Sequence, residues 1–180
     1  SWVAGTHYGN EVVLYQTSDL QPQSTLATTN CRGGVAFSPD GSRIATASLE
    51  LFDTVTWGRL WTSPPVALPT GSEHAVQFSP DGSEIVLTRC ELRPTPSCSS
   101  ERRSAVDGAV LGSLPGLSGQ RARYSPEGHW LVSGNDLVHV PTGRVVPDTF
   151  EGGQALFAPN GDIIAGEVDG SLVRYCRSSQ

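Results

Sequence analysis

The residues best suited to chemistry are four cysteines and four histidines, and most of them lie far apart in the sequence. Cys90 and Cys98 are the exception, because only seven residues, two of them proline, separate them. This spacing favours a disulfide that closes the segment, and with it an oxidising compartment outside the cytoplasm. The alternative is a pair of free thiols in a cytoplasmic loop. Cys31 and Cys176 cannot be paired from the sequence.

The histidines do not indicate a metal site. They are dispersed, no two of them share the spacing of zinc ligands, and no C-x-x-C motif is present. We therefore expect surface or structural roles for His7, His74, His129 and His139. The short acidic segment around Glu167, Asp169 and Gly170 could hold calcium, but a hairpin turn is the favoured interpretation.

The sequence also lacks the motifs of nucleophilic and phosphate chemistry. Gly116–Gly119 lacks the spacing of the G-x-S-x-G nucleophile turn, and no glycine-rich phosphate loop is found. The carboxylates of Asp40, Asp81 and Glu127 occupy one repeated turn position, which accounts for their recurrence. We predict no catalytic, cofactor-binding or metal-binding residue, and a chain that is not an enzyme.

Composition narrows the classes of partner. The net charge is −6 and the pI is about 5.1, which disfavours nucleic acid as a partner. All 12 basic residues are arginine. No run of apolar residues is long enough to span a membrane. Methionine is absent, so we expect an excised or processed part of a longer chain.

The strongest pattern is a repeated hairpin motif in which an aromatic residue is followed by Ser or Ala, Pro, an acidic or amide residue, and Gly. Proline suits the second position of such a turn and glycine the position with positive φ. The aromatic residues lie 41, 46 and 33 residues apart, around the length of one propeller blade. The four copies are Val35–Gly41, Val76–Gly82, Ala122–Gly128 and Ala155–Gly161.

Further apolar segments complete each repeat as a four-stranded antiparallel sheet. The predicted second strands are Arg43–Ala47, Glu84–Thr88, Trp130–Val132 and Asp162–Ala165. The predicted third strands are Leu51–Asp53, Ala105–Asp107, Leu137–Val140 and Leu172–Tyr175. The predicted fourth strands are Leu60–Thr62, Val110–Leu114 and Arg144–Val146. We expect Trp57, Trp61 and Trp130 to pack between sheets.

The sequence resembles the WD-repeat propellers and their bacterial relatives. The resemblance rests on the S-P-D-G hairpins and on Phe52-Asp53, which occupies the place of the family's Trp-Asp pair before the turn Thr54–Arg59. It implies an all-β fold, a β-propeller of four-stranded blades, and it says little about function. The Trp-Asp and Gly-His pairs themselves are absent, so the family's hydrogen-bond network is not expected.

The repeats predict three full blades between two partial ones. We expect the last three strands of a blade in residues 1–30, full blades in 31–70, 71–118 and 119–152, and an incomplete blade in 153–180. Open blade edges invite self-association. Three arrangements would cover them: a larger ring completed by other residues, a four-bladed ring in which the strand near Leu26 completes the blade that ends at Tyr175, or packing on a second copy or another domain.

The function expected from this pattern is a non-catalytic scaffold that presents loops to another protein or domain. The third-strand spacing is 54 residues from Phe52 to Val106, against 34 and 35 in the next repeats, and the extra length falls in Cys90–Arg103. We predict a partner-contact loop there, with Arg93, Arg102 and Arg103 as the contact residues. The alternatives are a neutral insertion and, for the whole chain, an accessory propeller of a larger secreted hydrolase or signalling kinase.

Overall fold

The structure, a computed structural model, consists of strands, turns and loops. Eighteen strands form five antiparallel sheets, and no helix occurs among the residues that the structure describes. Those residues are 2–7, 10–29, 33–64, 72–91, 97–114, 122–147, 149–150, 154–166 and 169–176. Within these ranges nothing has the helical length and apolar character that crossing a membrane would need.

Three sheets have four strands each, and within each sheet the strands pair in the order in which they follow along the chain. The second sheet contains β4 (Val35–Phe37), β5 (Arg43–Thr46), β6 (Glu50–Asp53) and β7 (Arg59–Thr62). The third contains β8 (Ser72–Phe78), β9 (Glu84–Glu91), β10 (Ser97–Ser104) and β11 (Val110–Leu114). The fourth contains β12 (Arg123–Tyr124), β13 (Trp130–Ser133), β14 (Asp136–His139) and β15 (Arg144–Val146).

The first and fifth sheets have three strands each in the described residues. The first contains β1 (Trp2–His7), β2 (Glu11–Gln16) and β3 (Pro22–Ala27). The fifth contains β16 (Gln154–Phe157), β17 (Ile163–Gly166) and β18 (Leu172–Tyr175). By register, the first sheet lacks the counterpart of an inner strand such as β4, and the fifth lacks the counterpart of an outer strand such as β7.

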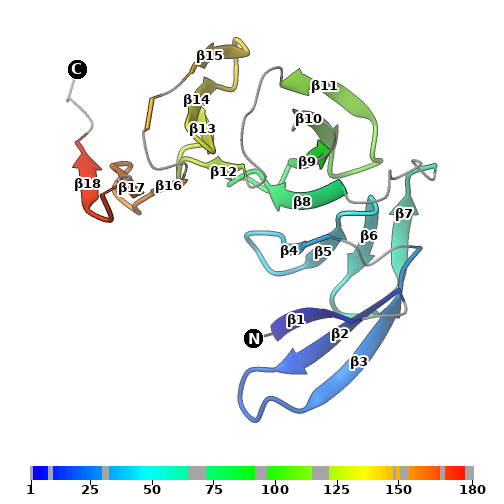
Figure 1. Ribbon diagram of the computed structural model, residues 1–180. Helices are drawn as coiled ribbons and strands as arrows, with labels where there is room; N and C mark the ends of the chain where they lie inside the picture. Colours follow the sequence, from blue (N-terminus) through cyan, green and yellow to red (C-terminus); the bar gives the residue numbers. More distant parts are fainter. Residues whose placement is uncertain are drawn as a thin grey trace.

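The five sheets follow one another around an open arc (Figure 1). The strands that begin the sheets lie beside one another on the concave side, β4 beside β8 and β12 beside β16. Side chains on each sheet alternate between a face toward the preceding sheet and a face toward the following one. The apolar core is therefore divided among the interfaces between neighbouring sheets.

Each of the four interfaces has its own buried cluster. Ile44 and Phe52 pack on the first sheet, whereas Ala45 and Leu51, one residue away on the same strands, pack on the third. The first interface contains Val12, Leu14 and Leu26, and the second interface contains Phe78, Ile85 and Leu87. The third interface contains Val86, Tyr124, Leu131 and Val138. The fourth interface contains Val132, Phe150 and Ala165. Sheets that shelter one another around an axis define a β-propeller.

The repeated hairpin turns join the first two strands of these sheets. Gly41, Gly82, Gly128 and Gly161 have φ values of 72°, 71°, 78° and 87°, a region in which glycine avoids the steric cost of a side chain. Successive turns lie close together, because a Cβ added to Gly82 would lie 3.5 Å from the ring of Pro39, and one added to Gly128 would lie 3.5 Å from Pro80. The motif thus shapes the hairpin, and its copies in neighbouring sheets lie next to one another.

The expected fold class, three full blades between two partial ones, is confirmed. The tryptophans Trp57 and Trp61 pack at the first and second interfaces, and Trp61 donates a hydrogen bond from Nε1 to the Ala105 carbonyl at 3.4 Å. The four-bladed closure is not formed. Leu26 pairs with Val12 inside the first sheet, rather than completing the sheet of β18.

The third sheet corrects two expectations. Ala105–Asp107 forms the turn before β11 and not a third strand; the third strand is the polar segment Ser97–Ser104. The extra length in Cys90–Arg103 is therefore mostly a long strand pair and not an inserted loop, because β9 and β10 are eight residues each where β5 and β6 have four. Pairing with β9 selects this strand despite its polar sequence.

Candidate functional site

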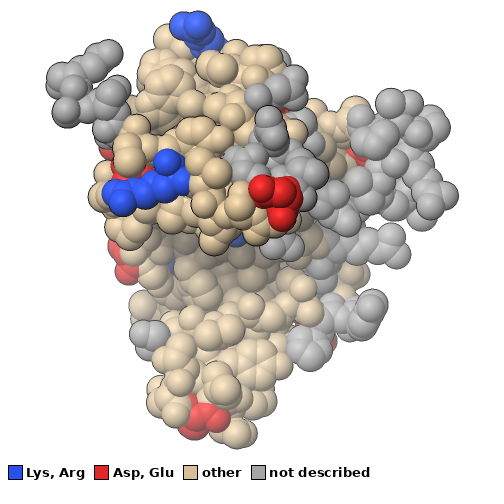
Figure 2. Space-filling view, turned by 60° about the vertical axis from the view of Figure 1, so that its left-hand side comes forward, with Lys and Arg blue, Asp and Glu red and all other residues tan. Residues whose placement is uncertain are grey.

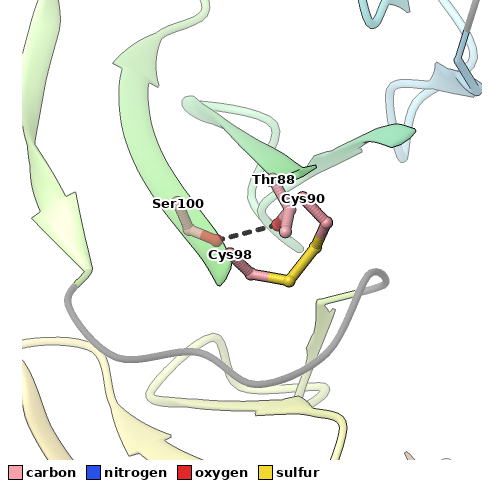
Figure 3. The surroundings of a disulfide bond; sticks show 4 residues. All are labelled: Thr88, Cys90, Cys98 and Ser100. Carbon is pink, nitrogen blue, oxygen red and sulfur yellow. Dashed lines mark hydrogen bonds between the residues drawn. A yellow bond between two sulfur atoms is a disulfide. The ribbon is translucent and has the colours of Figure 1, made fainter. Parts of the chain in front are cut away.

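The long hairpin of β9 and β10 is closed by the predicted disulfide. Cys90 and Cys98 are direct partners across the two strands and form the bond, which confirms the pairing expected from their spacing. Two residues further along each strand, the buried hydroxyls of Thr88 and Ser100 share a hydrogen bond of 2.9 Å (Figure 3). The covalent bond and this hydrogen bond hold the far end of the hairpin together on one face.

The two arginines predicted to contact a partner are engaged within the sheet. Arg102 donates from Nε and Nη2 to both carboxylate oxygens of Glu84, at 2.8 and 2.6 Å, and this hydrogen bonding raises the pKa of Arg102. Arg103 donates to Glu101 at 2.5 Å and to the Gly108 carbonyl at 2.8 Å. Both arginines thus form ion pairs with acidic neighbours on the same sheet, and their contact with a partner stays a prediction. Arg93 lies outside the described residues.

The Arg102–Glu84 pair has a counterpart at the same register position of the fifth sheet. There Arg174 donates from Nε to Asp162 at 2.7 Å, and Nη2 also contacts that carboxylate. The two pairs differ in what covers them. Arg102 is 23% exposed beside the fourth sheet, whereas Arg174 is 62% exposed.

A fully buried carboxylate at Glu50 links the first and second sheets, and the sequence analysis missed it. Glu50 accepts hydrogen bonds from the Thr29 amide at 2.9 Å and from the Ser48 hydroxyl at 2.8 Å. Arg59 lies 3.2 Å from the other carboxylate oxygen and donates to the Ala27 carbonyl at 2.8 Å. The sequence carries no signal for it, because the equivalent acid, Glu101, aligns with Glu50 only through the observed pairing of β10 with β9. The arrangement is a structural clamp.

The turn carboxylates have the role that their repetition predicts. Asp40 accepts hydrogen bonds from the Ser38 hydroxyl at 2.5 Å and from the Ser42 amide at 3.0 Å, and these lower the pKa of Asp40 from 3.8 to about 2. Asp81 likewise accepts hydrogen bonds from the Ser79 hydroxyl and from the Ser83 amide, and these bonds lower the pKa of Asp81. Such carboxylates are committed as hydrogen-bond acceptors in their own turns.

The remaining candidates do not gather into one site in the described residues. His74 is buried, and burial, together with the positive charge of Arg89, lowers its pKa. His139 stacks against Trp130, with 4.7 Å between ring centroids. Within the described ranges, no three His, Cys, Asp or Glu side chains are grouped so as to hold a metal ion. Cys176 is an exposed thiol.

Four further residues or segments singled out in the sequence fall wholly or partly outside the described residues. Cys31, Glu167 and the Gly116–Gly119 segment lie outside the described residues, as does the side chain of His7. Asp169, from the acidic segment considered for calcium, accepts a hydrogen bond from the Ser171 amide at 2.8 Å. That contact is a turn contact of the kind made by Asp40.

A groove of about 510 Å³ runs along the concave side of the arc. It is bordered by the inner strands and by the turn prolines Pro39, Pro80, Pro126 and Pro159. A second hollow of about 240 Å³ lies beside β8 and includes His74, Gln77 and Arg123. Figure 2, in which the left-hand side of Figure 1 comes forward, shows few charged side chains among the described residues and no extended patch of one charge.

The turns between third and fourth strands carry exposed apolar residues at equivalent positions. Val55 and Val106 are 83% and 78% exposed, and Pro141 is the exposed residue at this place in the fourth sheet. The turn backbone is fixed: Asp53 accepts from the amides of Val55 and Thr56 at 3.0 and 2.7 Å. We call Val55, Val106 and Pro141 the turn tips.

Comparison with known proteins supports the fold. No family model and no curated protein sequence matches the chain. Among solved structures, it is similar to Kuenenia stuttgartiensis hydrazine synthase, with a TM-score of 0.66 and 15% sequence identity over 99% of this chain and 68% of that one. That protein contains a β-propeller. At this identity the likeness shows the fold alone.

Proposed function

We propose that the chain is a non-catalytic scaffold that binds another protein through the turn tips. The observation that carries the proposal is the repetition of an exposed apolar residue at one position of three successive sheets. An apolar side chain on a rigid turn loses little conformational entropy when a partner covers it, so its burial contributes to affinity. The turn hydrogen bonds of Asp53 supply that rigidity.

The propeller framework supports this role because it fixes the turns relative to one another. Thr54 donates from its hydroxyl to the Gly41 carbonyl at 2.7 Å, and the Ala105 amide donates to Ser83 at 2.9 Å. In the second and third sheets, the turn that carries a tip is thereby tied to the Ser-Pro-Asp-Gly turn of the same sheet. A partner would meet a preformed surface rather than mobile loops.

The compartment that we propose for this binding is an oxidising one outside the cytoplasm. The Cys90–Cys98 disulfide supports it, since structural disulfides persist where thiols are not kept reduced. The relation to WD-repeat propellers is part of the same proposal and is supported by the shared hairpin motif. That the chain performs no reaction of its own is also proposed, supported by the engagement of Asp40 and Asp81 in their turns.

The alternative is an accessory propeller within a larger enzyme. It is favoured by the similarity to a chain of hydrazine synthase, which is an enzyme by name. The native polypeptide, identified by peptide mass spectrometry from the source cells, separates the two. A catalytic domain on the same polypeptide favours the accessory role, and further propeller blades alone favour the scaffold.

The scaffold proposal is tested by replacing Val55 and Val106 with serine. Both side chains are exposed, so the variant should keep the stability of the parent chain. We expect the proteins retained by the parent in affinity purification from source extracts to be reduced at least tenfold with the variant. Leu111→Ser, at an exposed apolar residue of the outer strand β11 and away from these turns, is the matched control. Equal retention by the parent and the Val55/Val106 variant would rule out the turn tips as the binding surface.

A further inference from the structure

Among the described residues, one face of the fifth sheet is covered by no other sheet, and the equivalent face of the third sheet is covered by the fourth. We call this the leading face: Gln154, Leu156, Ile164, Leu172 and Arg174, which alternate with the residues that pack on the fourth sheet. Leu156 is 50% exposed and Leu172 is 77% exposed. Two exposed leucines on one flat sheet face are unusual for surface that remains in water.

The third sheet shows what covers a face of this kind. By register, Gln77, Val86 and the Arg102–Glu84 pair correspond to Leu156, Ile164 and the Arg174–Asp162 pair. Val86 packs under the fourth sheet, which contributes Tyr124, Leu131 and Val138. Tyr124 is buried in the same cluster as Val86, so its ring is part of the cover over this face. The covering element is thus a sheet with aliphatic side chains and an aromatic ring.

The first sheet presents such a surface on its own uncovered side. We call this the trailing face: Val3, Gly5, Val13 and Tyr15, on the side opposite to the residues that pack on the second sheet. Val3 and Tyr15 are cross-strand partners, as Leu131 and Val138 are in the fourth sheet. The Tyr15 ring lies over Gly5, where an added Cβ would be 3.7 Å from the ring. Val3 is 48% exposed.

We propose that the leading face binds the trailing face of a second copy of this chain. The contact continues the sheet-on-sheet interface already seen between neighbouring sheets, with Val3 and Tyr15 in the places of Leu131 and Val138. It buries Leu156 and Leu172 and covers the exposed Arg174–Asp162 pair. The two faces are different, so the association is head-to-tail and leaves one free face of each kind on every assembly that does not close into a ring.

The test uses two variants of the chain 1–180, each blocked at one face. Leu156→Glu with Leu172→Glu blocks the leading face, and Val3→Glu blocks the trailing face. All three positions are exposed, and thermal unfolding with circular dichroism checks that the variants remain folded. Leu111→Glu, at an exposed position of β11 that belongs to neither face and is not a turn tip, is the control. Sedimentation velocity over a range of protein concentrations gives the assembly state.

We expect the parent and the Leu111→Glu control to form assemblies larger than a monomer as concentration rises. Each blocked variant alone should be a monomer, with association weakened at least tenfold. An equal mixture of the two should form a heterodimer that grows no further, because each chain contributes its one intact face. A monomeric parent at all concentrations, assemblies that persist in either blocked variant, or a mixture without heterodimer would each overturn the proposal.

Failure here is distinct from failure of the scaffold proposal. The turn tips lie on neither face, and retention of other proteins by the tips is measured with the leading and trailing faces intact.

Discussion

The residues of the Ser-Pro-Asp-Gly turn determine both its backbone conformation and its hydrogen bonds. Proline and glycine fix the backbone, and Asp40 gathers hydrogen bonds from Ser38 and Ser42 on either side. The glycine position that needs positive φ also faces the proline of the preceding sheet, since a Cβ added to Gly82 would lie 3.5 Å from Pro39. The residue that satisfies the local backbone requirement therefore lies where two neighbouring turns approach each other.

The lowered pKa of Asp40 predicts a stability change in acid. The folded-state pKa is about 2 against an ordinary value of 3.8, so the ionised carboxylate stabilises the fold above about pH 4. That contribution should be lost as the pH falls from 4 toward 2. Asp40→Asn should be less stable than the parent at pH 5, and the difference should shrink by pH 2. Urea unfolding across this range measures it.

A direct titration provides the control. The carboxyl ¹³C shift of Asp40, followed by NMR in the folded protein, should have its midpoint near pH 2. A midpoint at the ordinary value of 3.8 would contradict the role given to Ser38 and Ser42.

At the scale of elements, the hairpin of β9 and β10 shows that pairing with a neighbouring strand can make a polar segment adopt a strand. Ser97–Ser104 has little strand character by side-chain type, yet its residues align one by one with β9. The disulfide and the Thr88–Ser100 hydrogen bond secure the end of the hairpin, and the Arg102–Glu84 pair secures its base. The sequence indicated the Cys90–Cys98 disulfide but not the strand Ser97–Ser104. The spacing of two cysteines can be read directly from neighbouring residues, whereas the pairing of two strands cannot.

Replacing Cys90 and Cys98 together by serine should lower the free energy of unfolding. Removing the constraint on the unfolded chain predicts a loss of about 2 to 3 kcal/mol for a loop of this length. Urea unfolding with and without reductant measures it, and reductant should have no effect on the variant. Cys176→Ser is the control, since this thiol is exposed. If the free energy of unfolding of the parent chain is the same with and without reductant, the expectation is contradicted.

At the scale of the whole molecule, stability resides between sheets rather than inside them. Leu131, which is 0% exposed, belongs to the fourth sheet but packs in a cluster with Val86 and Leu114 of the third. Each sheet depends on its neighbours for the burial of both faces. The two outer faces are the exception among the described residues, and the head-to-tail proposal follows from them.

Leu131→Ala should therefore weaken two sheets at once. Removing a buried leucine costs about 2 to 5 kcal/mol. Hydrogen exchange should show reduced amide protection in both the third and the fourth sheets, while the exposed Leu60→Ala changes little. Loss of protection confined to the fourth sheet would show that the interface is not shared in this way.

The sequence by itself determined the repeat, its hairpins, the all-β class and the Cys90–Cys98 pair. These follow from φ preferences and from short spacings, which are properties of neighbouring residues. Only the tertiary structure decided that Arg102 and Arg103 form ion pairs, that Glu50 is buried, and that Leu156 and Leu172 share an uncovered face. Those facts depend on which strands pair and which sheets pack together, and such contacts join residues far apart in the chain.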